Sequence, residues 1–536
     1  MPPIVQEIIT AHTPESLVAQ LQGEPGLALL RSALFDSPQA RYSFVAVNPF
    51  LTFRSFGSRC EIVCPVVDAA RRRTSRTPER CDPPPHVGGY VQFGDPWHVL
   101  DSLMSRYELL DEIDLPFPLG GCFGYWGYDL KNFVEPKLRR HAVNDLELPD
   151  CHVGFYDSLV VFDHRLDTVS VVSTGLSADG SRCEQRARRR TEYWEKLLTS
   201  EPPRTLTPDL SHPMAEGESS PVRESRDGSQ HSAGVRKHLP LSPGGAEGWW
   251  EGALASNLTR AEFLAAVARA QRYIRAGDIY QVNLSQRLTA PCPCSGWELF
   301  ERLLSVSPAP FAAYLDCGDF QIASSSPEQF LRLSESHVTT RPIKGTRPRS
   351  SDATRDAQLA YELQTSPKEL AELVMITDLL RNDLGRVCEF GSVQVPELAK
   401  LERFPQVQHL VSTIEGRLRR DVTHFATLAS CFPGGSITGA PKFRAMEIID
   451  ELEPLARGPY CGCHGYLGFN RESQLSISIR TAIRRADTAY FHVGAGIVAD
   501  SVPEAEYEET LAKAGGFFAA LRLRGKSQPL SRPKLF

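Results

Sequence analysis

One stretch of the chain, residues 201–247, limits how everything around it can fold. It holds seven prolines and many Ser, Gly and charged residues, and it contains no Phe, Trp or Tyr. Such a segment cannot bury enough apolar surface to offset the entropy that it would lose on ordering. We therefore predict a flexible linker or surface insertion over 201–254, between an N-terminal region, 1–200, and a C-terminal region, 255–525.

The remainder has the composition of a globular protein with balanced charge. Hydrophobic residues make up 41% of the 536, and 59 basic residues face 65 acidic ones, for a net charge of −6. Neither a nucleic acid nor an anionic membrane surface is therefore expected as a partner. No apolar stretch approaches the roughly 18 residues that span a bilayer, and residues 1–10 lack a signal-peptide pattern. Thirteen scattered cysteines without a CxxC pair indicate reduced thiols, so we expect a cytoplasmic protein.

Local patterns predict several helices and strands. Thr259 and Glu262 form a capping box for a helix that Gly277 ends, and a strand follows over 280–285. Ser366 caps a second helix that runs to about Asp383. In the N-terminal region we expect strands over 27–30 and 42–47 with a polar loop around Pro38, a glycine-rich turn over 120–125, and a hairpin of 159–162 with 169–172.

Acidic residues on two predicted helices leave two interpretations open. Glu372 lies in an apolar stripe, where a carboxylate must be paired, hydrogen-bonded or bound to a cation unless it sits at the helix edge and reaches water. Glu509 and Lys513, four residues apart on the last helix, fit either a surface ion pair or part of a pocket that holds magnesium.

Three segments are rich in glycine and small polar residues: 341–346, 432–442 and 493–497. Glycines let the backbone approach an anion, and Ser, Thr and Lys442 add donors ahead of a helix expected from about Phe443. Each segment alone is as typical of an ordinary turn, and Lys344 alone would be an exposed loop lysine. The spacings of a Walker A loop and of a dinucleotide fingerprint are both absent.

Taken in order, motifs across nearly all of the C-terminal region resemble those of the chorismate-utilising enzymes, which include anthranilate synthase component I, aminodeoxychorismate synthase component I, and the isochorismate and salicylate synthases. The matching motifs are GDIYQVNLSQR (277–287), SSPEQF (325–330), RPIKGTRPR (341–349), ELVMITDLLRNDLGR (372–386), HLVSTIEGRL (409–418), FPGGSITGAPK (432–442), YCGCHGYLG (460–468), SISIRTAI (476–483) and GAGIVADSVPEAEYEET (494–510).

The resemblance implies an α+β fold of large antiparallel β-sheets stacked as a sandwich with outer helices. Lys344 within PIKGT is typical of aminodeoxychorismate synthase component I, whereas the anthranilate synthases usually carry alanine there. The implied activity converts chorismate and ammonia to 4-amino-4-deoxychorismate, for 4-aminobenzoate and folate. The chain has no glutaminase nucleophile elbow, so a separate glutamine amidotransferase subunit is expected as partner. One alternative is anthranilate synthase component I, but Lys344 would obstruct the C2 position of the substrate. The other is a non-catalytic regulatory paralogue, which the presence of Glu328, Lys344, Glu372 and Glu509 argues against.

The resemblance also implies roles for single residues. Glu328 would be the general acid for loss of the C4 hydroxyl, Lys344 the transient nucleophile at C2, and Glu372 and Glu509 the ligands of Mg²⁺. Gln281 stands where hydroxylating relatives carry a water-activating lysine, which argues against isochorismate synthesis. The matching substrate-binding positions are Gln281, Gly345, Thr346, His409, Thr438, Tyr460, Arg480, Gly494, Ala495, Gly496 and Lys513.

A tryptophan-binding element of the same family is implied in the N-terminal region. Its positions correspond to Ser32, Gln39, Ala40, Arg41, Tyr42, Pro310, Phe311 and Ala312. Arg31 replaces the glutamate of the usual Leu-Leu-Glu-Ser, which argues against feedback inhibition. A bound structural L-tryptophan remains compatible with the sequence.

Overall fold

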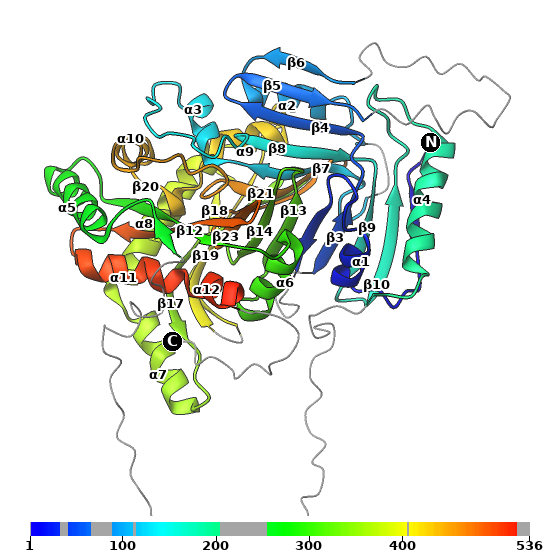
Figure 1. Ribbon diagram of the computed structural model, residues 1–536. Helices are drawn as coiled ribbons and strands as arrows, with labels where there is room; N and C mark the ends of the chain where they lie inside the picture. The colour runs from blue at the N-terminus through cyan, green and yellow to red at the C-terminus, as the bar shows by residue number, and fades with distance from the viewer. Residues whose placement is uncertain are drawn as a thin grey trace, which may run out of the picture.

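Two large antiparallel sheets, sheet A and sheet B, form the body of the protein (Figure 1). The computed structural model describes residues 2–32, 41–65, 88–110, 114–203, 254–404 and 407–522. Within these residues each sheet has twelve strands. The α+β architecture expected from the resemblance is thereby confirmed.

Sheet A contains, in spatial order, β1 (Ile4–Glu7), β10 (Thr168–Ser173), β9 (Ser158–Asp163), β3 (Tyr42–Ala46), β2 (Ala28–Arg31), β13 (Phe311–Asp316), β14 (Phe320–Ser326), β23 (Thr481–Arg485), β24 (Thr488–Ile497), β12 (Gln281–Pro291) and β11 (Ala255–Ser256), with β20 (Gly439–Ala440) beside β12. Sheet B contains β17 (Ile343–Pro348), β19 (Val407–Arg417), β16 (His337–Arg341), β15 (Gln329–Ser334), β22 (Glu472–Ile477), β21 (Cys463–Gly468), β7 (Gly121–Trp126), β8 (Cys151–Tyr156), β4 (Leu51–Phe56), β5 (Arg59–Val63) and β6 (Tyr90–Phe93), with β18 (Gln394–Arg403) beside β19.

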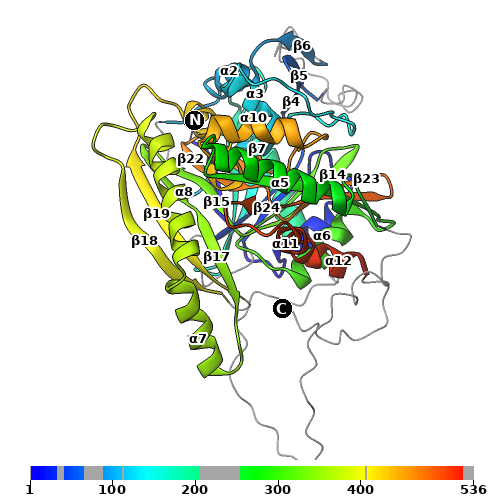
Figure 2. The ribbon, with the colours of Figure 1, turned by 90° about the vertical axis from the view of Figure 1, so that its left-hand side faces the viewer.

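Helices surround the two sheets. They are α1 (Pro14–Gln20), α2 (Pro96–Met104), α3 (Lys131–Val134), α4 (Glu184–Leu198), α5 (Arg260–Ala276), α6 (Gly296–Val306), α7 (Ala353–Gln364), α8 (Pro367–Gly385), α9 (His424–Cys431), α10 (Lys442–Leu452), α11 (Pro503–Lys513) and α12 (Gly515–Arg522). The side view shows α7 and α8 lying along β17 and β19 (Figure 2).

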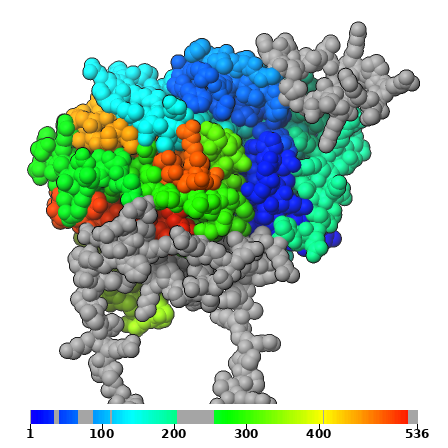
Figure 3. All heavy atoms as spheres, viewed as in Figure 1, coloured from blue at the N-terminus to red at the C-terminus, as the bar shows by residue number. Residues whose placement is uncertain are grey.

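Strands from both regions of the sequence share each sheet. In sheet A, β2 pairs with β13, and in sheet B, β7 pairs with β21. The space-filling view accordingly shows blue N-terminal residues in one continuous surface with green C-terminal residues (Figure 3). The predicted linker over 201–254 falls almost wholly outside the described residues, as does the loop around Pro38.

Aromatic side chains fill the space between the sheets. Phe44 of β3 packs edge-on against Tyr466 of β21, with ring centroids 5.0 Å apart, and Tyr125 of β7 meets Phe320 of β14 at 6.2 Å. All four belong to one buried cluster. Such burial of large aromatic surface is the main stabilising term for a sandwich of this kind.

Most local predictions are confirmed. Thr259 and Glu262 make the capping box of α5, which ends at Gly277, and Ser366 caps α8. β9 and β10 form the expected hairpin. The predicted turn over 120–125 is wrong: it is β7, a strand buried along its whole length, because β8 and β21 flank it and both its faces are covered. Among the described residues, no helix is both long and apolar enough to cross a membrane.

Candidate functional site

A polar cavity of about 500 Å³ opens where the β12 end of sheet A meets the β17 end of sheet B. Helices α8 and α11 supply acidic residues to its wall. Most sequence-predicted site residues meet here, although they lie up to 185 positions apart by number, from 328 to 513. The predicted residues that line the cavity are Glu328, Lys344, Gly345, Thr346, Glu372, His409, Tyr460, Arg480, Gly494, Gly496, Glu509 and Lys513.

A β-bulge sets the direction of Lys344. The pairing of β17 with β19 shifts register between Lys344 and Thr346, and Gly345 there has a φ of +66°, which glycine adopts readily. The Lys344 ammonium approaches the carbonyl oxygen of Ser436 at 3.5 Å. Burial lowers the pKa of Lys344, against the opposing pull of the Glu372 and Glu328 carboxylates. A lysine with a lowered pKa is more often neutral, and so more nucleophilic.

Glu328 lies buried between β14 and β15, beside Lys344. Burial raises the pKa of its carboxyl to about 7, while a hydrogen bond with the Ser436 side chain and the charge of Lys344 act in the opposite direction. A carboxyl with this pKa is about half protonated at pH 7, as a general acid must be. Glu328 and Lys344 therefore form a pair inside the cavity whose pKa values have moved toward each other.

The wall also offers cationic and neutral donors. Arg480 follows β22 with a φ of +49°, and its guanidinium has no hydrogen-bond or ion-pair partner within the described residues. Burial lowers the pKa of Arg480, so a carboxylate ligand would relieve an unbalanced cation. His409 accepts or donates a 2.9 Å hydrogen bond with Thr346 Oγ1, and burial lowers its pKa to about 4, which leaves the ring neutral.

Two glycines of β24 make room for neighbouring side chains. A Cβ on Gly494 would lie 2.8 Å from the Tyr460 hydroxyl, and one on Gly496 would lie 2.5 Å from Gln281 Nε2. Lys513 donates to the Gly494 carbonyl at 2.9 Å and pairs with Glu509 at 2.8 Å. Gln281 is 2% exposed, and neither atom of its amide has a hydrogen-bond partner in the described structure.

Three predicted substrate-binding residues lie behind the cavity wall. Gln281, Thr438 and Ala495 are buried and do not line the cavity. The Thr438 hydroxyl donates to the Gly434 carbonyl at 3.1 Å and so supports the loop over residues 434–438. Lys442, expected as an anion donor, does not line the cavity either, because it pairs with Asp383 of α8 at 2.6 Å.

The carboxylates fit the requirements of a magnesium ion. Glu372 and Glu509 share the cavity, and Glu372 has no hydrogen-bond or ion-pair partner in the described residues. Burial raises the pKa of Glu372, and the nearby Glu369 and Glu509 add to this, so a divalent cation would relieve the repulsion. No group of three or more His, Cys, Asp or Glu ligands converges in that part of the chain. Two carboxylates completed by water and substrate oxygens are what Mg²⁺ prefers.

Sequence reasoning missed several lining residues. Glu369 and Glu506 each lie three positions before a predicted metal ligand, at the spacing that places two residues on one helix face. That spacing was the signal that could have found them. Ser436 and His492 carried no such signal. Ser436 contacts Glu328 across the cavity, and His492 stacks on Tyr460 with ring centroids 5.0 Å apart.

Residues of the tryptophan element line a second, smaller cavity of about 40 Å³. Ser32, Tyr42, Pro310, Phe311 and Ala312 line it. Arg41 does not, because it pairs with Asp163 at 2.6 Å, and Gln39 and Ala40 lie outside the described residues.

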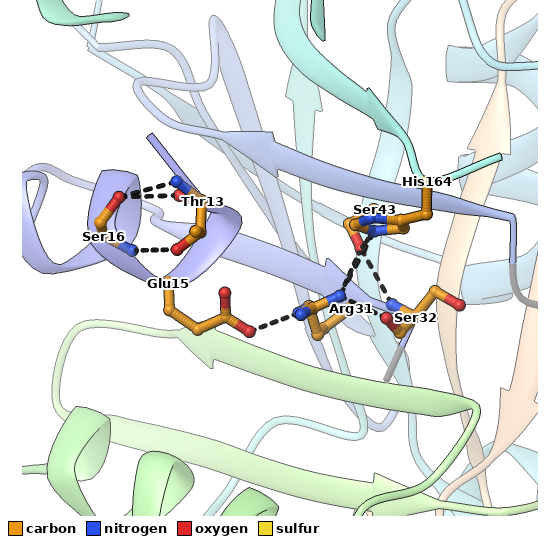
Figure 4. A network of polar contacts seen from close by, with 7 residues as sticks. All are labelled: Thr13, Glu15, Ser16, Arg31, Ser32, Ser43 and His164. Carbon is orange, nitrogen blue, oxygen red and sulfur yellow. Dashed lines mark hydrogen bonds and ion pairs between the residues drawn. The ribbon is translucent and has the colours of Figure 1, made fainter. Parts of the chain in front are cut away.

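Arg31 is held by a network of the protein's own groups beside this second cavity (Figure 4). Its guanidinium pairs with Glu15 of α1 and donates to the Ser32 carbonyl. The same side chain reaches the Ser43 hydroxyl at 3.4 Å and His164 Nε2 at 3.3 Å. The charge of Arg31 is therefore already balanced by the Glu15 carboxylate of the same chain.

Comparisons with known proteins show which chains this one resembles. A family described as chorismate binding enzyme matches residues 31–519. The chain is 42% identical over 425 residues to aminodeoxychorismate synthase component 1 of Salmonella typhimurium, covering 79% of this chain and 82% of that protein. It is 35% identical over 531 residues to anthranilate synthase component 1 of Acetivibrio thermocellus, covering 98% and 96%. The crystal structure of anthranilate synthase component I from Streptococcus pneumoniae TIGR4 matches with a TM-score of 0.68 at 29% identity, covering 90% of this chain and 93% of that one.

Fold and cavity together define an enzyme that acts on a small anionic substrate. The chain belongs to the chorismate-binding enzyme family. Within it, the chain is a chorismate-utilising enzyme of the anthranilate synthase and aminodeoxychorismate synthase type.

Proposed function

We propose that this chain is the aminating component of an aminodeoxychorismate synthase, which converts chorismate and ammonia to 4-amino-4-deoxychorismate. The observation that carries the proposal is Lys344, an amine of lowered pKa inside the cavity beside the acid Glu328. The family resemblance associates a lysine here with amination at C4 and an alanine with anthranilate formation. The relative from Salmonella typhimurium, at 42% identity, points the same way.

The residues can perform two displacements in sequence. Glu328 gives its proton to the C4 hydroxyl, which leaves as water, while the neutral Lys344 amine adds at C2 and the ring double bonds shift. The attached amine then loses a proton to the Glu328 carboxylate, whose charge acts on Lys344. Ammonia adds at C4 while Glu328 returns its proton to the C2-bound nitrogen, and the C2–N bond breaks to release the neutral Lys344 amine. The ammonium formed at C4 then gives one proton to the Glu328 carboxylate, which restores the acid. Arg480 and Lys513 are the cations in the wall that suit the substrate's two carboxylates.

Glu372 and Glu509 are the proposed ligands of Mg²⁺. When bound, the ion would neutralise a carboxylate of chorismate and help to orient the ring. Without it, two carboxylates and a dianionic substrate would repel each other in the same cavity.

The ammonia source is proposed to be a separate glutamine amidotransferase subunit. The relatives named above are each called component 1 of their synthase. The Gly-x-Cys-x-Gly run at residues 120–124 is no nucleophile elbow with which to hydrolyse glutamine, because Cys122 lies on the strand β7 and is 0% exposed. The product would then feed 4-aminobenzoate and folate synthesis.

A product assay tests the proposal. The protein is incubated with chorismate, ammonium and magnesium, and an aminodeoxychorismate lyase is added before chromatography with fluorescence detection. We expect 4-aminobenzoate and no anthranilate. Anthranilate as the sole product would refute the proposal and assign the chain to the anthranilate synthase branch. No product with either ammonium or a glutaminase subunit would favour a non-catalytic paralogue.

A further inference from the structure

A buried ion pair lies directly behind the cavity. Arg457, only 2% exposed, follows α10, and its guanidinium donates to the Glu453 carboxylate at 2.8 and 2.7 Å. The same guanidinium donates to the Asn283 carbonyl at 2.7 Å and to the Ile437 carbonyl at 3.3 Å. Neither Arg457 nor Glu453 lines the cavity.

Glu453 extends the network into sheet A. One oxygen of its carboxylate accepts from the Ser285 backbone N–H at 2.8 Å and from the Ser285 hydroxyl at 3.0 Å. The Asn283 side chain donates to the Ile437 carbonyl at 3.1 Å, which therefore accepts from two groups. One charge pair thus ties together β12, the loop at 435–438 and the turn after α10.

Each tied segment presents a residue to the cavity. Asn283 and Ile437 line it directly, and so does Tyr460, whose ring lies 5.7 Å from the Arg457 guanidinium carbon. Ser436, next to Ile437, has its carbonyl 3.5 Å from the Lys344 ammonium and its side chain on Glu328. The loop that carries Ser436 is therefore anchored by Arg457 on one side and contacts both reacting groups on the other.

Stability alone gives little reason for such a pair. A buried ion pair often contributes no more to folding than apolar residues of similar volume, because both charges lose their hydration. A planar guanidinium can, however, hold a carboxylate and two carbonyls in fixed directions at once. We propose that Arg457 and Glu453 are positioning residues, which hold the Ser436–Ile437 segment, Asn283 and Tyr460 in register with Lys344 and Glu328. This inference rests on the proposed function for the identity of the reacting groups, but not on which amination product forms.

A second buried ion pair provides a matched control. Lys131 of α3 and Asp450 of α10 pair at 3.0 Å with 0% and 6% of their side chains exposed. Neither residue lines the cavity, and neither is hydrogen-bonded to a residue that does. Exchange of either pair for apolar residues removes one buried ion pair and one cation over the Tyr128 ring. Only the first exchange also removes hydrogen bonds to Ser285, Asn283 and Ile437, which connect the pair to the cavity wall.

The test compares two double variants, Glu453→Leu with Arg457→Met and Asp450→Leu with Lys131→Met. For each, kcat and KM are measured for the product that the wild type forms, together with the thermal midpoint. We expect the first double variant to keep a thermal midpoint close to that of its control while kcat falls roughly a hundredfold, as expected for reacting groups misplaced by about 1 Å. KM should change much less than kcat. The control should keep most of its kcat.

Two further measurements keep the inference falsifiable. If the apolar variant does not fold, Glu453→Gln keeps the shape of the side chain and weakens only the charge pair, and a smaller loss of kcat is expected. Hydrogen exchange in peptides that cover 281–285 and 434–440 should be faster in the first double variant than in the control, whatever product is formed. Equal kcat and equal exchange in the two double variants would overturn the positioning role. A wild type that makes anthranilate would overturn the proposed function but not this inference.

Discussion

Replacement of Glu328 by glutamine should make the protein more stable and less active, with a stability gain that depends on pH. In the folded protein, burial raises the pKa of this carboxyl from 4.5 to about 7. The folded state therefore binds more protons than the unfolded state between these two values, and stability declines as pH rises through that window. A shift of this size corresponds to about 3 kcal/mol. Glutamine has no such ionisation, so the whole of this decline disappears in Glu328→Gln.

The assay is thermal unfolding of wild type and Glu328→Gln at pH 4.5 and at pH 8. We expect the variant's advantage over wild type to be larger at pH 8, by about 3 kcal/mol at most, because the pKa of about 7 already includes the opposing effect of Lys344. The exposed Glu508 on α11 supplies the control, since Glu508→Gln removes a carboxylate that water already solvates. The amination kcat of Glu328→Gln should fall by roughly 10²–10⁴. An identical difference from wild type at both pH values would refute the raised pKa, and with it the role of Glu328 as the acid.

Three other outcomes follow from the same geometry. Lys344→Ala should lower the kcat for the C4-aminated product by roughly a hundredfold or more, measured as 4-aminobenzoate after lyase treatment, and unchanged amination would remove the lysine from the mechanism. Ser436→Ala removes a hydrogen bond that lowers the pKa of Glu328, so the decline of kcat with rising pH should move to higher pH; a stationary profile would contradict that contact. A hydrogen bond from Cys292, whose sulfur lies 3.4 Å away, lowers the pKa of Cys294 to about 7. Iodoacetamide at pH 7 should therefore alkylate Cys294 faster than the exposed Cys183, as measured by peptide mass spectrometry. Faster alkylation of Cys183 would contradict the lowered pKa of Cys294.

Local chemistry explains which parts of the structure the sequence could predict. The cap of α8 at Ser366 depends only on neighbours within one turn, so the local sequence predicts it correctly. The two glycines of β7 predict a turn from local sequence, whereas the strands that flank β7 come from residues 151–156 and 463–468. The two interpretations of Glu372 could not be separated on one helix, since the cavity it lines is completed by segments from both sheets.

The same limit applies to the charged residues. Lys442 looks like an anion donor within its own loop, and only the position of Asp383 on α8 shows that its charge is already balanced. No sequence motif marks Arg457 or Glu453. Arg457 binds backbone carbonyl groups, and a residue of any type could supply these. The family resemblance brought most of the site together in sequence, and the structure was needed to show which residues lie at the surface of the cavity and which lie behind it.

The sharing of both sheets between the two ends of the sequence has a consequence for how the protein is made. As the chain leaves the ribosome, β7 is synthesised at residues 121–126, yet its partner β21 begins at residue 463. At ribosomal rates of about 5–20 residues per second, one edge of β7 stays unpaired for tens of seconds. An unpaired strand edge is a template for pairing with another chain. The nascent chain therefore carries an aggregation risk until about the last seventh of the polypeptide has been made. We expect chaperones to be needed by the nascent chain rather than by the finished enzyme.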